Sequence, residues 1–236
     1  MRLFVHMPKC AGTSVYHVLD AAAHDDVVRD YDSLFKIPLD QRKLKIDLFS
    51  CHPEKIDERK IVYGHFFPIK YIGVNKNRKF KLVTILRDPI DRIISHYKFW
   101  NSHQFSDHYL WKKMKDQKWT LMEFAMSTEM CNFYKQYFYG ISMEDFSFIG
   151  IYENLDYSVK MCLQELSVSF EDGVVIPNLN VTESTCEMKL SHDDIVKLKN
   201  FHGEDYEIYN FAKKKFHEIN DAVLRAHPSA RMDLCG

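Results

Sequence analysis

The sequence predicts an α/β fold in which a central parallel sheet is flanked by helices, with extra helices at the C-terminus. Short apolar runs at residues 3–5, 61–63 and 81–86 are typical of buried strands, and two of them lead directly into segments with helical periodicity. Strands that alternate with helices indicate a parallel sheet. The 236 residues are 46% hydrophobic, enough for one sizeable core, so residues 1–236 are expected to form a single domain.

The first apolar run leads into a loop over residues 6–14 and then into a predicted helix over residues 15–23. Such a layout binds phosphate, because the N–H groups and peptide dipoles at a helix N-terminus attract an anion. Lys9 adds a positive charge, and the paired hydroxyls at the end of the loop add donors. Lys9 precedes Gly12, so the order differs from the GxxxxGK[ST] pattern of nucleoside triphosphate loops. A tight strand–helix turn with a surface lysine is the alternative interpretation.

Residues 24–60 are polar and irregular, with two prolines, and are expected to form short helices and loops around the sheet. The apolar run at 61–63 then ends in a Gly-His pair at His65. A single histidine among aromatic residues is usually a buried core residue, so these residues alone favour a structural role.

The run at residues 81–86 ends at Arg87, and apolar residues at helical spacing predict a helix that begins near Pro89. Open α/β sheets bind ligands at the carboxyl ends of their strands, which is where Arg87 lies. Arg92 and Ser95 lie off the apolar stripe of this helix and are expected to face the same crevice. The alternative for Arg87 is an ion pair with a neighbouring aspartate.

The remaining chain continues the α/β pattern. Aromatic residues between 106 and 140 are expected mostly in the core, and some are candidates to line an acceptor pocket. Residues 146–152 are a candidate strand, and a helix is expected to follow it as far as Leu166. Residues 191–226 predict one or two amphipathic helices.

The segments PKCAGTS and LRDPIDRIISHYKF together resemble the two nucleotide-binding signatures of the sulfotransferases that use 3′-phosphoadenosine-5′-phosphosulfate (PAPS). The similarity is to the carbohydrate branch that includes heparan sulfate 2-O-sulfotransferase. This resemblance implies a P-loop-like sheet and PAPS as co-substrate, without a metal. It also implies that Arg87 and Ser95 bind the 3′-phosphate and that the first loop binds the 5′-phosphosulfate. The loop residues implied are Lys9, Cys10, Ala11, Gly12, Thr13 and Ser14.

The resemblance also implies catalytic roles for two residues. The 2-O-sulfotransferases carry a Gly-His pair at the position of His65 and use this histidine as the catalytic base. At neutral pH an imidazole can accept the proton of an acceptor hydroxyl. Lys9 would stabilise charge on the bridging oxygen as the sulfuryl group leaves. Tyr63 is a departure, since a second histidine can stand there in those enzymes. Residues 177–182 are similar to a loop near the adenine in this family.

The function implied is an O-sulfotransferase that moves the sulfuryl group of PAPS to an acceptor hydroxyl by in-line displacement. A carbohydrate acceptor is expected from the branch, and a small molecule is the other possibility. Two alternatives stay open. An atypical P-loop kinase would place Mg²⁺ at Asp88, and a non-catalytic module would bind a nucleotide or glycan on the same fold.

Charge and hydropathy exclude some partners. The net charge is −1, so no overall positive field attracts nucleic acid or membrane surfaces. No stretch approaches the length of a membrane span, and the chain begins at its first strand without a signal segment, which predicts a cytoplasmic protein. Golgi relatives carry an anchor and stem, so a trimmed form of such a protein would belong to the Golgi lumen. Neither the oligomeric state nor the acceptor can be predicted from these features.

The six cysteines show no metal-ligand spacing, and their scatter fits a reducing compartment. Cys10 lies beside Lys9 and near a helix N-terminus, a position that can lower a thiol pKa. A nucleophilic Cys10 is therefore a weaker hypothesis. Asn180 begins an N-glycosylation sequon, which has no meaning in a cytoplasmic protein.

Overall fold

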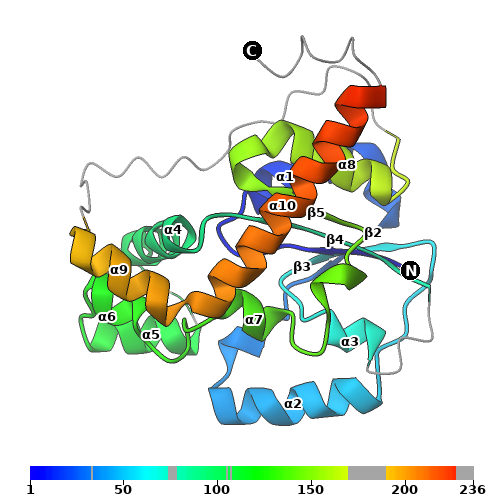
Figure 1. Ribbon diagram of the computed structural model, residues 1–236. Coiled ribbons are helices and arrows are strands. Elements are labelled where there is room, and N and C mark those ends of the chain that lie inside the picture. Colours follow the sequence, from blue (N-terminus) through cyan, green and yellow to red (C-terminus); the bar gives the residue numbers. More distant parts are fainter. Residues whose placement is uncertain (33, 74–78, 105, 107, 170–189, 227–236) are drawn as a thin grey trace.

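Five parallel strands form the centre of the molecule, in the order β2-β3-β1-β4-β5 (Figure 1). The computed structural model describes residues 1–32, 34–73, 79–104, 106, 108–169 and 190–226. The strands are β1 (Arg2–Val5), β2 (Val27–Asp30), β3 (Ile61–Gly64), β4 (Lys81–Leu86) and β5 (Phe148–Ile151). The predicted α/β fold with a central parallel sheet is therefore confirmed.

Helices cover both faces of this sheet. In Figure 1, α1 and α8 lie on one side, and α2 and α3 lie on the other. The long C-terminal helix α10 packs against β5 and α7. The α-helices are α1 (Gly12–Ala23), α2 (Leu39–Cys51), α3 (Ile69–Ile72), α4 (Pro89–Ser102), α5 (Tyr109–Asp116), α6 (Leu121–Ala125), α7 (Phe133–Tyr137), α8 (Leu155–Glu165), α9 (His192–Phe201) and α10 (Gly203–Ala226).

The sheet register brings three loops to one edge. Val5 at the end of β1 pairs with Gly64 of β3 on one side and with Thr84 of β4 on the other. Because the strands are parallel, the loops that follow β1, β3 and β4 leave the sheet at the same edge. From β1 the chain continues to the edge strand β2, and from β4 it continues to β5 at the opposite edge. Open α/β sheets form a ligand crevice where neighbouring strands diverge in this way.

Residues 24–60 form helices and loops, as expected, and also one strand, β2, that was not expected. The edge strand β2 has only four residues, and its Arg29 is exposed, so it lacks the apolar pattern of an inner strand. Helix α2 has 13 residues, but only Arg42 and Ile46 are buried. Leu44 and Leu48 are 72% and 57% exposed, so they lie off the buried face of this helix. Its apolar residues therefore do not form the single stripe by which a helix is recognised in a sequence.

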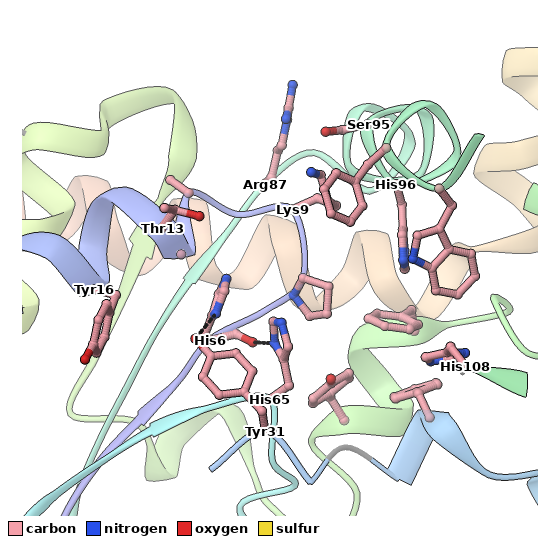
Figure 2. Close-up of a pocket in the computed structure, with 18 of the residues that line it drawn as sticks. His6, Lys9, Thr13, Tyr16, Tyr31, His65, Arg87, Ser95, His96 and His108 are labelled. Carbon is pink, nitrogen blue, oxygen red and sulfur yellow. Dashed lines mark hydrogen bonds between the residues drawn. The ribbon is translucent and has the colours of Figure 1, made fainter. Parts of the chain in front are cut away.

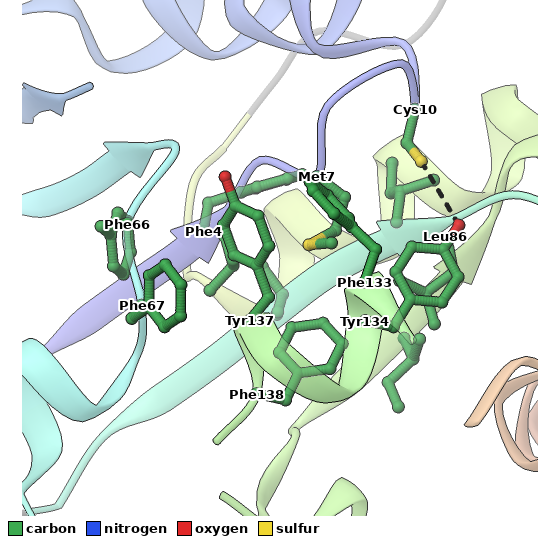
Figure 3. Close-up of a cluster of buried hydrophobic side chains, with 14 of the residues drawn as sticks. Phe4, Met7, Cys10, Phe66, Phe67, Leu86, Phe133, Tyr134, Tyr137 and Phe138 are labelled. Atoms are coloured by element: carbon green, nitrogen blue, oxygen red, sulfur yellow. Dashed lines mark hydrogen bonds between the residues drawn. The ribbon is translucent and has the colours of Figure 1, made fainter. Parts of the chain in front are cut away.

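Aromatic side chains fill the core beneath the loop after β1 (Figure 3). The rings of Phe67 and Tyr137 stack with centroids 4.9 Å apart, and those of Phe35 and Phe133 lie 4.3 Å apart. Most aromatic residues between 106 and 140 are buried, as expected, although Tyr139 is 54% exposed. That region forms the three short helices α5, α6 and α7. Among the described residues, no helix is long and apolar enough to span a membrane.

Candidate active site

The loop between β1 and α1 is a strained turn. The Cys10 amide donates to the Met7 carbonyl over 3.1 Å, which places Pro8 at the second position of the turn. Lys9 follows with φ of 70°, and Ala11 has φ of 60°. Left-handed backbone at a non-glycine residue costs about 1–3 kcal/mol and is concentrated at functional sites. Lys9 and Ala11 both line the pocket described below.

Gly12 begins α1 and lies directly against the ring of His6. A Cβ atom at this position would lie 1.5 Å from His6 Nε2, so no other residue fits without moving the histidine. The Gly12 carbonyl accepts a hydrogen bond of 2.6 Å from the buried Tyr63 hydroxyl, which ties the loop to β3. Thr13 and Ser14 come next, in the first turn of the helix, and line the pocket. Their backbone is at the end of α1 that favours an anion.

The Lys9 side chain places a positive charge at the wall of the pocket. Its ammonium lies 3.9 Å from the centroid of the Phe99 ring, a cation–π contact. Burial lowers the pKa of Lys9 to about 8, and the positive charge of Arg87 acts in the same direction. Because this pKa still exceeds 7, most Lys9 side chains are charged at neutral pH.

The loop after β4 supplies the second cation. The Arg87 guanidinium lies 4.3 Å from the ring centroid of Tyr152, and both residues line the pocket together with Ser95. The expectation that Arg92 faces the same crevice is wrong. Arg92 is fully buried, does not line the pocket, and lies over the Phe133 ring at 4.2 Å. Arg92 lies on the core-facing side of α4. Its charged side chain had wrongly suggested a position outside the core.

His65 follows β3, and a hydrogen bond selects its tautomer. Its Nδ1 lies 2.6 Å from the carbonyl oxygen of His6, and because a carbonyl only accepts, Nδ1 must carry the proton. The neutral ring therefore has its lone pair on Nε2. Burial lowers the pKa of His65 to about 4, and the charge of Lys36 contributes to the lowering. His65 is neutral at pH 7 and can accept a proton at Nε2.

His6 was not identified as a site residue from the sequence. Its ring centroid lies 4.2 Å from that of His65, and its Nδ1 lies 3.4 Å from the Tyr31 hydroxyl. Tyr31 also contacts His65 edge to face, with centroids 4.9 Å apart. Burial moves the pKa of His6 well below its ordinary value, and the charge of His65 adds to this. The two histidines and the tyrosine thus form one neutral cluster at pH 7.

These loops enclose a cavity of about 520 Å³ (Figure 2). Its lining includes four cationic side chains and, among the described residues, no Asp or Glu, so the site suits an anionic ligand. Ligand pockets typically measure about 300–1,000 Å³. The lining residues are His6, Pro8, Lys9, Ala11, Gly12, Thr13, Ser14, Tyr16, Arg29, Tyr31, Phe35, Lys36, His65, Arg87, Ser95, His96, Phe99, Trp100, His108, Leu110, Met130, Phe133, Tyr137 and Tyr152.

The Cys10 thiol turns away from this cavity, although its backbone is part of the loop. Its sulfur lies 3.9 Å from the Tyr134 hydroxyl in the core (Figure 3), and the residue is 2% exposed. Burial raises the pKa of Cys10 to about 11. A buried thiol with a raised pKa is a poor nucleophile, so the geometry does not favour a covalent role. Residues 177–182, including the sequon at Asn180, lie outside the described residues.

Two further lining residues could have been found from helical spacing. Phe99 is four residues after Ser95, and Trp100 is four residues after His96, so each pair lies on one face of α4. Tyr31 gives no such signal, because it follows an edge strand that the sequence pattern does not reveal.

Several solved structures are similar to this chain at low identity. A sulfotransferase from Alicyclobacillus acidocaldarius is 18% identical, with a TM-score of 0.47, and the match covers 92% of this chain and 95% of that one. Mouse sulfotransferase SULT7A1 complexed with PAP is 12% identical, with a TM-score of 0.35 and coverage of 72% and 60%. Retinol dehydratase in a complex with retinol and PAP is 12% identical, with a TM-score of 0.32 and coverage of 72% and 62%.

Similarity in sequence covers a smaller part of the chain than similarity in structure. No curated protein matches the chain. Residues 44–155, which include β3, β4, α4 and β5, match the sulfotransferase domain family.

Proposed function

We propose that this protein is a PAPS-dependent O-sulfotransferase that transfers a sulfuryl group to an acceptor hydroxyl. The observation that carries the proposal is the cavity itself: its described lining residues include no Asp or Glu, and two separate strand-end loops bring Lys9 and Arg87 to it. A donor with phosphate at both ends of its nucleoside suits cations at two positions. The match to the sulfotransferase domain family supports the same activity.

The loop after β1 would hold the 5′-phosphosulfate. Thr13 and Ser14 and the first backbone amides of α1 supply donors, and Lys9 supplies charge. Arg87 and Ser95 would hold the 3′-phosphate, and a guanidinium can bind a phosphate through two parallel hydrogen bonds. Of these donor-binding residues, Lys9 would also take part in the reaction itself.

In the reaction, the bond between sulfur and the bridging oxygen of the 5′-phosphate breaks while a bond from the acceptor oxygen to sulfur forms. His65 would accept the acceptor proton at Nε2, the atom left unprotonated by the hydrogen bond to His6. Lys9 would neutralise the negative charge that develops on the leaving phosphate oxygen. Positioning and charge stabilisation are the main contributions of a protein to this type of transfer.

The carbohydrate acceptor and the cytoplasmic location implied by the sequence remain predictions. Of the alternatives, the kinase depended on Asp88 as a magnesium ligand. The Asp88 carboxylate accepts from the amides of Ile90 at 2.9 Å and Asp91 at 3.2 Å, and the Tyr206 hydroxyl donates to it at 3.2 Å. The two amide contacts cap α4, and the Tyr206 contact links Asp88 to α10, so both account for Asp88 without a ligand. A non-catalytic module would bind the nucleotide in the same cavity and fail only in turnover.

Calorimetric titration tests the donor. We expect 3′,5′-adenosine bisphosphate (PAP), the desulfated product, to bind in the micromolar range and ATP with Mg²⁺ to bind far more weakly. The opposite preference would replace the proposal with the kinase. PAP binding without formation of a sulfated product from PAPS, across a broad acceptor panel, would favour the non-catalytic module.

A further inference from the structure

We propose that His6 is a further catalytic residue, whose Nε2–H donates a hydrogen bond to the sulfuryl group of the bound donor. The inference rests on the proposed function and gives a role to a histidine that precedes the PKCAGTS segment. His6 is partly exposed and lines the cavity. Its backbone N–H donates to the Gly64 carbonyl over 2.9 Å, so the sheet holds the residue in place.

The His6 ring lies between the two ends of the proposed reaction path. At one end, its Nε2 lies only 1.5 Å from the position that a Cβ atom of Gly12 would take. At the other end, its ring centroid lies 4.2 Å from that of His65. Figure 2 shows the ring between Thr13 and His65. In an in-line displacement, sulfur lies between the leaving oxygen, at the start of α1, and the acceptor oxygen, at His65. The sulfuryl group would therefore lie beside His6.

The surroundings of Tyr31 determine which nitrogen of His6 carries the proton. His6 Nδ1 lies 3.4 Å from the Tyr31 hydroxyl oxygen. Burial raises the pKa of Tyr31, and Arg29, which can only donate, hydrogen-bonds to this hydroxyl and opposes the rise. Because the Tyr31 oxygen accepts from Arg29, its own proton is free to be donated to His6 Nδ1. The hydrogen of the neutral His6 ring is then on Nε2, the nitrogen beside Gly12.

The two neighbouring histidines therefore have opposite tautomers. His65 is protonated at Nδ1 and has its lone pair on Nε2, whereas His6 has its lone pair on Nδ1 and its N–H at Nε2. One ring can accept the proton of the acceptor hydroxyl while the other donates a hydrogen bond to a sulfuryl oxygen. His6 neither gains nor loses a proton, so the transfer to His65 stays balanced.

The sulfuryl oxygens require a donor of this kind. Negative charge spreads over them in the transition state, and fixed donors that face them lower the barrier. In the proposed site, Lys9 serves the bridging oxygen, and Thr13 and Ser14 serve the 5′-phosphate. Burial moves the pKa of His6 well below its ordinary value, and the charges of His65 and Lys9 add to this. A neutral His6 can thus lie beside Lys9 and beside a protonated His65 without charge repulsion.

Two amide variants separate the nitrogens of His6. The amide nitrogen of glutamine reaches about as far as Nε2 of histidine, whereas that of asparagine reaches about as far as Nδ1. We expect His6→Asn to lower kcat about 10²–10³-fold and His6→Gln to stay within about tenfold of the wild type. His24→Asn is the matched control, since His24 is 76% exposed and does not line the cavity.

A comparison of two nucleotides tests the contact itself, because PAP lacks the sulfuryl group that PAPS carries. In titrations without acceptor, His6→Asn should bind PAP within about threefold of the wild type and PAPS about fivefold or more weakly. Equal losses of kcat in His6→Asn and His6→Gln would overturn the inference. A loss of PAP affinity as large as the loss of kcat would also overturn it, since His6 would then only support the loop at Gly12.

The wild-type protein provides a test that needs no variant. Nitrogen-15 NMR of the imidazoles in the PAP complex should show His6 protonated at Nε2, and protonation at Nδ1 would overturn the inference. Failure of PAP to bind the wild type would refute the proposed function. If PAP binds but no acceptor is sulfated, catalysis fails, and the affinities of His6→Asn for PAPS and PAP still decide whether His6 contacts the sulfuryl group.

Discussion

Lys9 allows the donor site to be tested through pH. We predict that the affinity for PAP falls about 25-fold between about pH 7.5 and about pH 9.5. Burial and the nearby charge of Arg87 lower the pKa of Lys9 to about 8. The charged form of a lysine exists below its pKa, so raising the pH through 8 removes the cation that attracts the 5′-phosphate.

The magnitude follows from the protonated fraction of Lys9. With a pKa of about 8, the side chain is about three quarters protonated at about pH 7.5 and about 3% protonated at about pH 9.5. The ratio of about 25 corresponds to ~1.9 kcal/mol of binding free energy. A lysine with the ordinary pKa of about 10.4 would lose only about a tenth of its charge over the same range.

Isothermal titration calorimetry with PAP across this range measures the effect. Lys9→Arg is the control, because a guanidinium stays charged throughout and its affinity should not change with pH. The pKa values of His65 and Cys10, lowered to about 4 and raised to about 11, lie outside the window. A wild-type affinity that is constant with pH, or an equal decline in Lys9→Arg, would refute the reasoning.

Three other substitutions test the cavity. His65→Ala should lower turnover about 10²–10⁴-fold in initial-rate assays with little change in PAP affinity, and full activity with an unaltered pH profile would contradict its role as base. Arg87→Ala should weaken PAP about tenfold or more in calorimetry while leaving adenosine 5′-monophosphate nearly unaffected, and equal losses would remove Arg87 from the 3′-phosphate site. Gly12→Ala should lower the melting temperature and PAP affinity, because its Cβ would lie 1.5 Å from His6 Nε2. Adding His6→Ala should restore the melting temperature, and failure to do so would place the strain elsewhere.

Local patterns in the sequence were sufficient for the inner strands and for the two strand-to-helix loops. The apolar runs of β1, β3 and β4 have no competing periodicity, because these strands are buried on both faces. Lys9 and Arg87 each lie in a loop that follows a strand. Once the sheet was taken to be parallel, the sequence therefore predicted that both residues lie at the same edge of the sheet.

Other parts of the site depend on contacts between distant segments. His6 and His65 are 59 residues apart, and the contact between their rings requires that β1 and β3 be neighbours in the sheet. Phe35 and Phe133 meet across almost a hundred residues, and neither is part of a motif. The direction of Arg92 was decided by packing of α4 on the core, which sequence periodicity alone did not reveal.

The sequence by itself determined the fold class and the two strand-to-helix loops that carry Lys9 and Arg87, because backbone conformation and apolar periodicity are local properties. Only the tertiary structure decided which imidazole nitrogen of His65 is unprotonated, how far burial lowers the pKa of Lys9, and which aromatic rings line the cavity. These properties arise from desolvation and from neighbours supplied by other elements, and both come into existence only when the sheet and its helices pack together.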